Sequence, residues 1–156
     1  MSELILRNRQ RVRRLDHAML RRLIRSLLEG ELAVQNYELG IHLVAAPEMI
    51  RLNQKFLGHA GSTDVITFAY CENRKVVNGE IFVCLDDAVA QAKRFRTSWQ
   101  SEVVRYVIHG ILHLRGYDDL RAPNRHKMKR EEGRLLRKIA RHFPLSKLAA
   151  PPRLAA

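Results

Sequence analysis

The chain has 156 residues, 46% of them hydrophobic and 28% charged, and a formal net charge of +12. This size suffices for one globular domain with its own core, without disulfides or a structural metal. Cys71 and Cys84 are too few and too far apart for a disulfide framework, and their apolar neighbours indicate two buried free thiols in a reducing compartment. A run of about 18 apolar residues, as a membrane span needs, does not occur. We therefore expect a cytoplasmic protein.

The positive charge is concentrated at the two ends of the chain. Residues 7–25 contain eight arginines against one acid, and residues 121–153 contain eleven lysines and arginines against two acids. The stretch between, residues 26–114, has eight basic and ten acidic residues. Basic helices are typical of proteins that bind a polyphosphate, because each cation that meets a phosphate releases counterions. We interpret both ends as nucleic-acid-binding, with a merely solvated surface as the alternative.

Hydrophobic periodicity predicts the elements in chain order. They are a strand at 4–6, a helix over 15–28, a strand over 37–45, a helix over 47–57, strands over 63–68 and 79–85, and helices over 86–95, 98–114 and 123–142. Pro47 is suited to the first turn of its helix. Asp86 or Asp87 is expected to cap the next helix, and Ser98 or Ser101 the one after it.

The order of these elements predicts the fold class α/β, of the α+β type, with a single small sheet packed against helices. The helix over 98–114 has a wide apolar face, so we expect it to be central and buried. Residues 1–150 are predicted to form one domain. The segment 151–156, which begins with two prolines, is predicted to be a flexible tail.

The most informative motif combines two histidines with a glycine and two acids. His109 and His113 are one helical turn apart, so both imidazoles can reach one ion. Gly116 is suited to end the helix in the left-handed conformation, after which the chain can return Asp118 or Asp119 as an oxygen ligand. Two nitrogens and one carboxylate leave a coordination position open, which is typical of catalytic zinc, with Mn²⁺, Ni²⁺ or Cu²⁺ as substitutes.

The residue after the first histidine separates two kinds of hydrolase. Zinc peptidases carry a glutamate there as general base, whereas this chain has Gly110. A phosphodiester substrate fits better, because its negative charge suits both a metal and the basic ends. Either a metal-activated water or the 2′-hydroxyl of RNA can then serve as the nucleophile. A peptidase remains the less favoured alternative.

Several segments in order resemble a known family. These are Leu52-Asn53, Phe56, Thr63 to Phe68, Gly79 to Ile81, His109 to Asp119, and the later Met128, Glu131, Glu132 and Leu135. Together they are similar to the bacterial YbeY family of metal-dependent endoribonucleases. The resemblance implies a single-domain metallo-endoribonuclease with one bound Zn²⁺, which cleaves single-stranded RNA. It further implies a role in 3′ end maturation of the small-subunit rRNA and in ribosome quality control, with the rRNA precursor and the ribosomal subunit as partners.

The resemblance assigns both metal binding and catalysis to His109, His113 and Asp119. The family's usual third histidine is replaced here by Asp119, and His126 is the alternative third ligand. The arginine that often follows Phe56 in the family is replaced by Leu57. Cations that can stand in for it are Arg51, Lys55 and His59, and the resemblance also implies that Thr63 and Asp64 line the cleft. The competing hypothesis is a non-catalytic RNA-binding ribosome assembly factor with a structural metal.

Overall fold

The computed structural model describes residues 2–71, 73 and 75–150, so the predicted tail at 151–156 lies outside the described residues. Its strands are β1 (Glu3–Asn8), β2 (Asn36–Val44), β3 (Val65–Ala69) and β4 (Val76–Cys84). Its helices are α1 (His17–Arg25), α2 (Ala46–Leu52), α3 (Leu85–Phe95), α4 (Trp99–Leu114) and α5 (Ala122–His142). Two π-helical segments, η1 (Ser26–Glu31) and η2 (Asn53–Leu57), extend α1 and α2, and a short 3₁₀ helix, η3 (Leu145–Leu148), follows α5.

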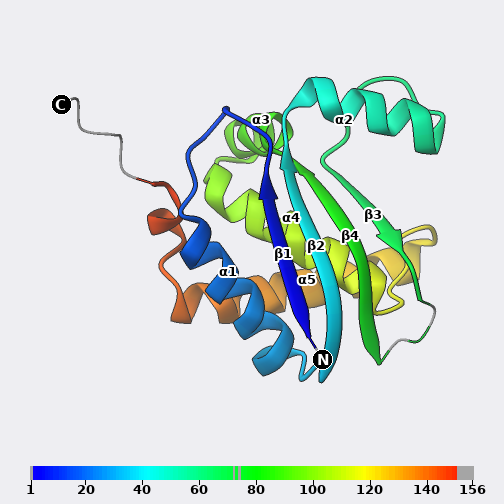
Figure 1. Cartoon of the computed structure of the whole chain (residues 1–156), viewed down its shortest axis with the longest axis vertical. Helices are drawn as coiled ribbons and strands as arrows, with labels where there is room; N and C mark the ends of the chain where they lie inside the picture. The colour runs from blue at the N-terminus through cyan, green and yellow to red at the C-terminus, as the bar shows by residue number, and fades with distance from the viewer. Residues whose placement is uncertain (1, 72, 74, 151–156) are drawn as a thin grey trace.

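The four strands form one sheet in the order β1-β2-β4-β3. β1, β2 and β4 are parallel, and β3 runs antiparallel to β4 at the edge. Figure 1 shows α4 and α5 behind this sheet, with α2 over one end of the opposite face. The predicted α+β class with a single small sheet is confirmed. That residues 1–150 form one domain stays a prediction.

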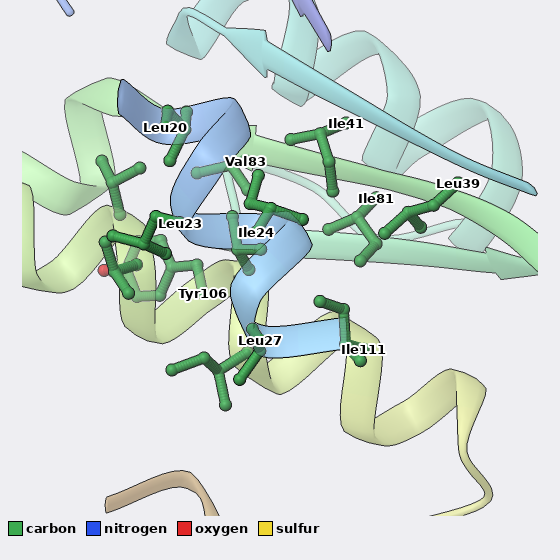
Figure 2. Packing of buried hydrophobic residues seen from close by; sticks show 14 of the residues in the cluster. Leu20, Leu23, Ile24, Leu27, Leu39, Ile41, Ile81, Val83, Tyr106 and Ile111 are labelled. Atoms are coloured by element: carbon green, nitrogen blue, oxygen red, sulfur yellow. The ribbon is translucent and has the colours of Figure 1, made fainter. Parts of the chain in front are cut away.

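The main core lies between the sheet and the helices behind it. Because side chains alternate along a strand, β2 and β4 turn one row of aliphatic residues toward α1 and α4. Figure 2 shows these residues interlocked: Leu20, Leu23, Ile24 and Leu27 near α1, Leu39, Ile41, Ile81 and Val83 on the sheet, and Tyr106 and Ile111 on α4. The predicted apolar face of α4 is fully buried. This burial makes α4 a rigid support for the side chains near its end.

A smaller apolar cluster lies on the other face of the sheet, beneath α2. It contains Val44, Met49, Ile66 and Cys84, with the rings of neighbouring phenylalanines packed against it. Cys84 is buried, as expected, but Cys71 is only half-buried, so the expectation of two buried thiols was wrong for Cys71. Within the described part of the chain, no helix is long and apolar enough to cross a bilayer.

The cap predicted for α3 was wrong. Cys84 occupies the N-cap position, and no side chain caps this helix. The Asp86 carboxylate instead accepts a hydrogen bond from the backbone N–H of Ala46, the first residue of α2. An unpaired N–H at a helix start is stabilised by a carboxylate from any part of the fold, and only the tertiary structure shows which helix benefits. For α4 the prediction of Ser98 is confirmed, because its side chain accepts from the N–H of Ser101.

Gly110 permits close packing of α4 on the sheet. A Cβ atom at this position would lie 2.7–2.8 Å from three side-chain atoms of Ile81 on β4. We expect Gly110→Ala to destabilise the fold by about 1–2 kcal/mol, because overpacking exceeds the gain in helix propensity. The free energy of unfolding in urea measures this change.

Gly133 in α5 is the matched control, since its added Cβ would meet only the flexible end of Arg137, at 3.3 Å. Gly133→Ala is expected to be neutral or stabilising by up to about 1 kcal/mol. Equal stability of Gly110→Ala and the wild type would contradict the packing argument.

Candidate metal centre

The end of α4 determines where the chain goes next. The N–H of Gly116 donates to the carbonyl of His113 at 2.9 Å, and the N–H of Tyr117 donates to the carbonyl of Leu112 at 3.0 Å. With Gly116 at φ +93°, these bonds form a Schellman motif. A left-handed residue is needed there, so the glycine predicted as the helix stop is confirmed. The reversal brings the following acidic residues back beside α4.

Asp119 lies next to both histidines. Its Oδ2 is 3.6 Å from His109 Nε2 and 3.5 Å from His113 Nε2, and the two Nε2 atoms are 3.1 Å apart. Tetrahedral ligands at about 2.0–2.1 Å from zinc stand about 3.3–3.4 Å from one another. The three observed separations bracket this value, so the described residues contain a triad of the right size for one ion.

The other ring nitrogens are held by the protein, which determines the tautomers. His109 Nδ1 lies 2.7 Å from Glu132 Oε1, and His113 Nδ1 lies 3.1 Å from the backbone carbonyl of Tyr117. Carbonyl and carboxylate oxygens only accept, so both Nδ1 atoms carry the hydrogen. When both imidazoles are neutral, their Nε2 atoms therefore turn lone pairs toward each other and toward the Asp119 carboxylate. A bound cation stabilises this arrangement of three electron donors.

The surroundings of His109 favour a positive charge. Burial opposes its protonation, but the hydrogen bond and charge of Glu132, together with the charges of Asp119 and Asp64, outweigh burial and raise the pKa of His109. Glu132 is itself buried and lies 3.6 Å from the guanidinium of Arg105. The same fields that raise this pKa attract a metal ion once the proton has left.

The triad opens into a cleft of about 380 Å³ between α4, β3 and η2. Thr63 and Asp64 line it, as the resemblance implied, and Leu57 lines it in place of an arginine. Arg51, Lys55 and His59 are exposed and do not line the cleft. The cleft wall among the described residues therefore lacks the substitute cation that we considered.

The structure distinguishes among the residues that the sequence left as possible third ligands. Asp118 Oδ1 accepts the backbone N–H of Leu120 at 2.8 Å, so this carboxylate stabilises the turn and is not part of the triad. His126 is exposed on α5 and is also not part of it. Asp119 is the third member of the cluster.

Glu132 is the residue of the site whose role the sequence analysis missed. It stands in the buried stripe of α5 with Met128, Leu135 and Ile139. A glutamate in an apolar stripe is a detectable signal, because a buried carboxylate requires a partner. That the partner is His109, 23 positions earlier, follows only from the packing of α5 on α4.

An α+β fold with a histidine–histidine–aspartate cluster in a cleft defines the class of candidate metallohydrolases. Within it, the family model described as "Endoribonuclease YbeY" matches residues 5–140, and the chain belongs to this family. The family and the enzyme class predicted from the sequence, a nuclease acting on RNA, are thereby confirmed.

Several relatives support this family assignment, and a solved structure shares the fold. Proteins named endoribonuclease YbeY are 34% identical in Chlorobium luteolum, over 83% of this chain and 93% of theirs, and 34% identical in Salinibacter ruber, over 81% and 85%. One from Chlorobium phaeovibrioides is 45% identical over 57% of this chain, but the match spans only 60% of that protein. The solution structure of a Thermotoga maritima protein superposes with a TM-score of 0.63 at 25% identity, covering 90% of this chain and 91% of that one.

The support of His109 by Glu132 can be tested directly. We expect Glu132→Gln to fold but to bind Zn²⁺ about 10–100-fold more weakly, because the partners of ligating histidines tune affinity by this amount. Competition against a chromogenic chelator measures it. Glu131→Gln is the matched control, since Glu131 pairs with Arg134 instead. Unchanged zinc affinity of Glu132→Gln, or an equal loss in the control, would contradict the assignment.

Proposed function

We propose that the protein is a zinc-dependent endoribonuclease that cleaves single-stranded RNA, with His109, His113 and Asp119 as metal ligands. The single observation that carries this proposal is the triad of two Nε2 atoms and a carboxylate oxygen at zinc-like separations. Bound zinc supplies a Lewis acid for the scissile phosphate and a water that ionises near neutral pH. The protein's own residues hold the ligands: Glu132 and the Tyr117 carbonyl orient the imidazoles.

Two groups of exposed cations support an RNA substrate. The first half of α5, which reaches the site through Glu132, and the N-cap residue before it expose a series of basic residues: Arg121, Arg125, Lys127, Lys129 and Arg130. The loop after β1 exposes Arg9, Arg11, Arg13 and Arg14. A polyanionic chain is attracted to both surfaces. A function in small-subunit rRNA maturation and ribosome quality control in the cytoplasm is part of this proposal, and the family resemblance supports it.

Removing a ligand tests the proposed function. We expect His113→Ala and Asp119→Ala to lose stoichiometric zinc and RNA cleavage together, while the fold and RNA affinity persist because neither residue belongs to the core. Elemental analysis, gel-based cleavage and circular dichroism on the same samples give the three readouts. Asp118→Ala is the control and is expected to keep its zinc, since Asp118 bonds only the turn.

The alternative, a non-catalytic assembly factor with a structural metal, predicts a different outcome. The wild type would then bind zinc and RNA without cleaving, and His113→Ala would lose stability along with its metal. Cleavage that persists after removal of zinc would exclude both hypotheses.

The carboxylate ligand affects the choice of metal. Carboxylate oxygen suits Mn²⁺ better than imidazole does, whereas imidazole suits Zn²⁺. Asp119→His is therefore expected to raise the preference for Zn²⁺ over Mn²⁺, measured as the ratio of the two dissociation constants in competitive titrations. A ratio identical to that of the wild type would show that Asp119 does not ligate the ion.

A further inference from the structure

A second pocket, of about 390 Å³, adjoins the metal cleft between α3, α4 and α5. Asp64 lines both the cleft and this pocket. Glu132, which lines the pocket, also accepts the hydrogen bond of His109, which lines the cleft. A ligand that enters the metal cleft therefore has the second pocket immediately beside it, across the pair of His109 and Glu132.

The walls of this pocket combine three features that suit a nucleotide. Phe95, at the end of α3, exposes 61% of its surface although it is a large apolar side chain, even with the Arg94 guanidinium 5.3 Å from its ring centroid. The Oε1 atom of Gln91 is buried and has no hydrogen-bond partner among the described residues. Lys129 is exposed, and the described part of the chain offers it no ion pair. A flat apolar ring, a buried acceptor and a free cation are the groups that bind a base, its edge and its phosphate.

The carboxylates of the pocket do not repel such a ligand strongly, because most of them are paired. Glu102 accepts a hydrogen bond from Thr97 Oγ1 at 2.7 Å and lies 3.7 Å from Arg105 Nε. Glu132 is shared between His109 and the other end of Arg105. The Arg105 guanidinium thus neutralises two buried acids at once, which leaves Asp64 as the remaining carboxylate of the lining.

We propose that this pocket is a nucleotide subsite for the RNA next to the scissile phosphate, an inference that rests on the proposed function. One base stacks on Phe95, and an N–H group of its edge donates to Gln91 Oε1. The Lys129 ammonium pairs with the phosphate that joins this nucleotide to the one at the metal. The unpaired acceptor is retained for the ligand, and the protein without RNA is less stable as a result.

An abasic scan tests the subsite independently of which base it prefers. A short single-stranded RNA is prepared with one abasic ribose moved along the chain, and its affinity is measured by fluorescence anisotropy with chelator present to prevent cleavage. For the wild type, we expect one position at which removal of the base weakens RNA binding about fivefold or more. Phe95→Ala should bind the intact RNA more weakly than the wild type by about this factor. The variant's affinity should not fall further when the base at that position is removed.

Gln91→Leu separates ligand binding from a structural role. It should bind intact RNA about three- to tenfold more weakly, while its stability stays equal to or above that of the wild type, because an unpaired buried acceptor has been removed. Lys129→Ala should weaken binding and reduce the dependence on salt. Lys138→Ala is its control, since Lys138 pairs with Glu31 at 3.4 Å.

Tyr70 is the matched control for Phe95, because it is 63% exposed but lies on the open face of the sheet, away from this pocket. Equal losses of RNA affinity in Tyr70→Ala and Phe95→Ala would overturn the subsite. So would the finding that, at every position, the effects of Phe95→Ala and of removing the base simply add. If the wild type cleaves RNA with zinc restored but these variants bind normally, only the subsite fails. If one abasic position weakens binding by the wild type but the protein never cleaves, the proposed function fails, and the pocket binds a base that is not next to a scissile phosphate.

Discussion

The site depends on how α4 ends. A helix buried in the core presents two imidazoles from one face, but the third proposed ligand comes from outside the helix. The left-handed Gly116 allows two backbone hydrogen bonds that reverse the chain within a few residues. The same reversal directs the Tyr117 carbonyl at His113 Nδ1 and Asp119 at both Nε2 atoms. One turn thus supplies one of the proposed ligands and orients another.

A chain of charges connects this turn to the rest of the fold. Glu132 on α5 holds His109, and Arg105 on α4 links Glu132 to Glu102. Each buried carboxylate in this series of charges has a cationic or hydrogen-bonding partner, as burial of charge requires. The same series of side chains also separates the metal cleft from the pocket that we assign to a nucleotide. Packing of α5 on α4 is therefore part of the site as well as of the core.

Short-range patterns made most of the fold and the triad predictable. Leucine spacing predicted α1, β-branched residues predicted β3, and the spacing of His109, His113 and Gly116 predicted the site, because these signals are local. The choice of Asp119 over Asp118 depended on the path of the chain beyond the turn. The Asp86 contact with α2 and the Glu132 contact with His109 join residues distant in sequence, which periodicity does not encode. The lack of a side-chain base at position 110 follows from the sequence, but the packing of Gly110 on Ile81 required the structure.

The most direct test of the central claim is X-ray absorption spectroscopy at the zinc edge on the protein loaded with one equivalent of zinc. The account predicts two imidazole nitrogens and oxygen ligands, all at about 2.0–2.2 Å, with no sulfur. In Asp119→Ala one protein oxygen should be replaced or the metal lost. A third imidazole, or a spectrum that Asp119→Ala leaves unchanged, would show that the turn after α4 does not deliver the third ligand and would contradict the account.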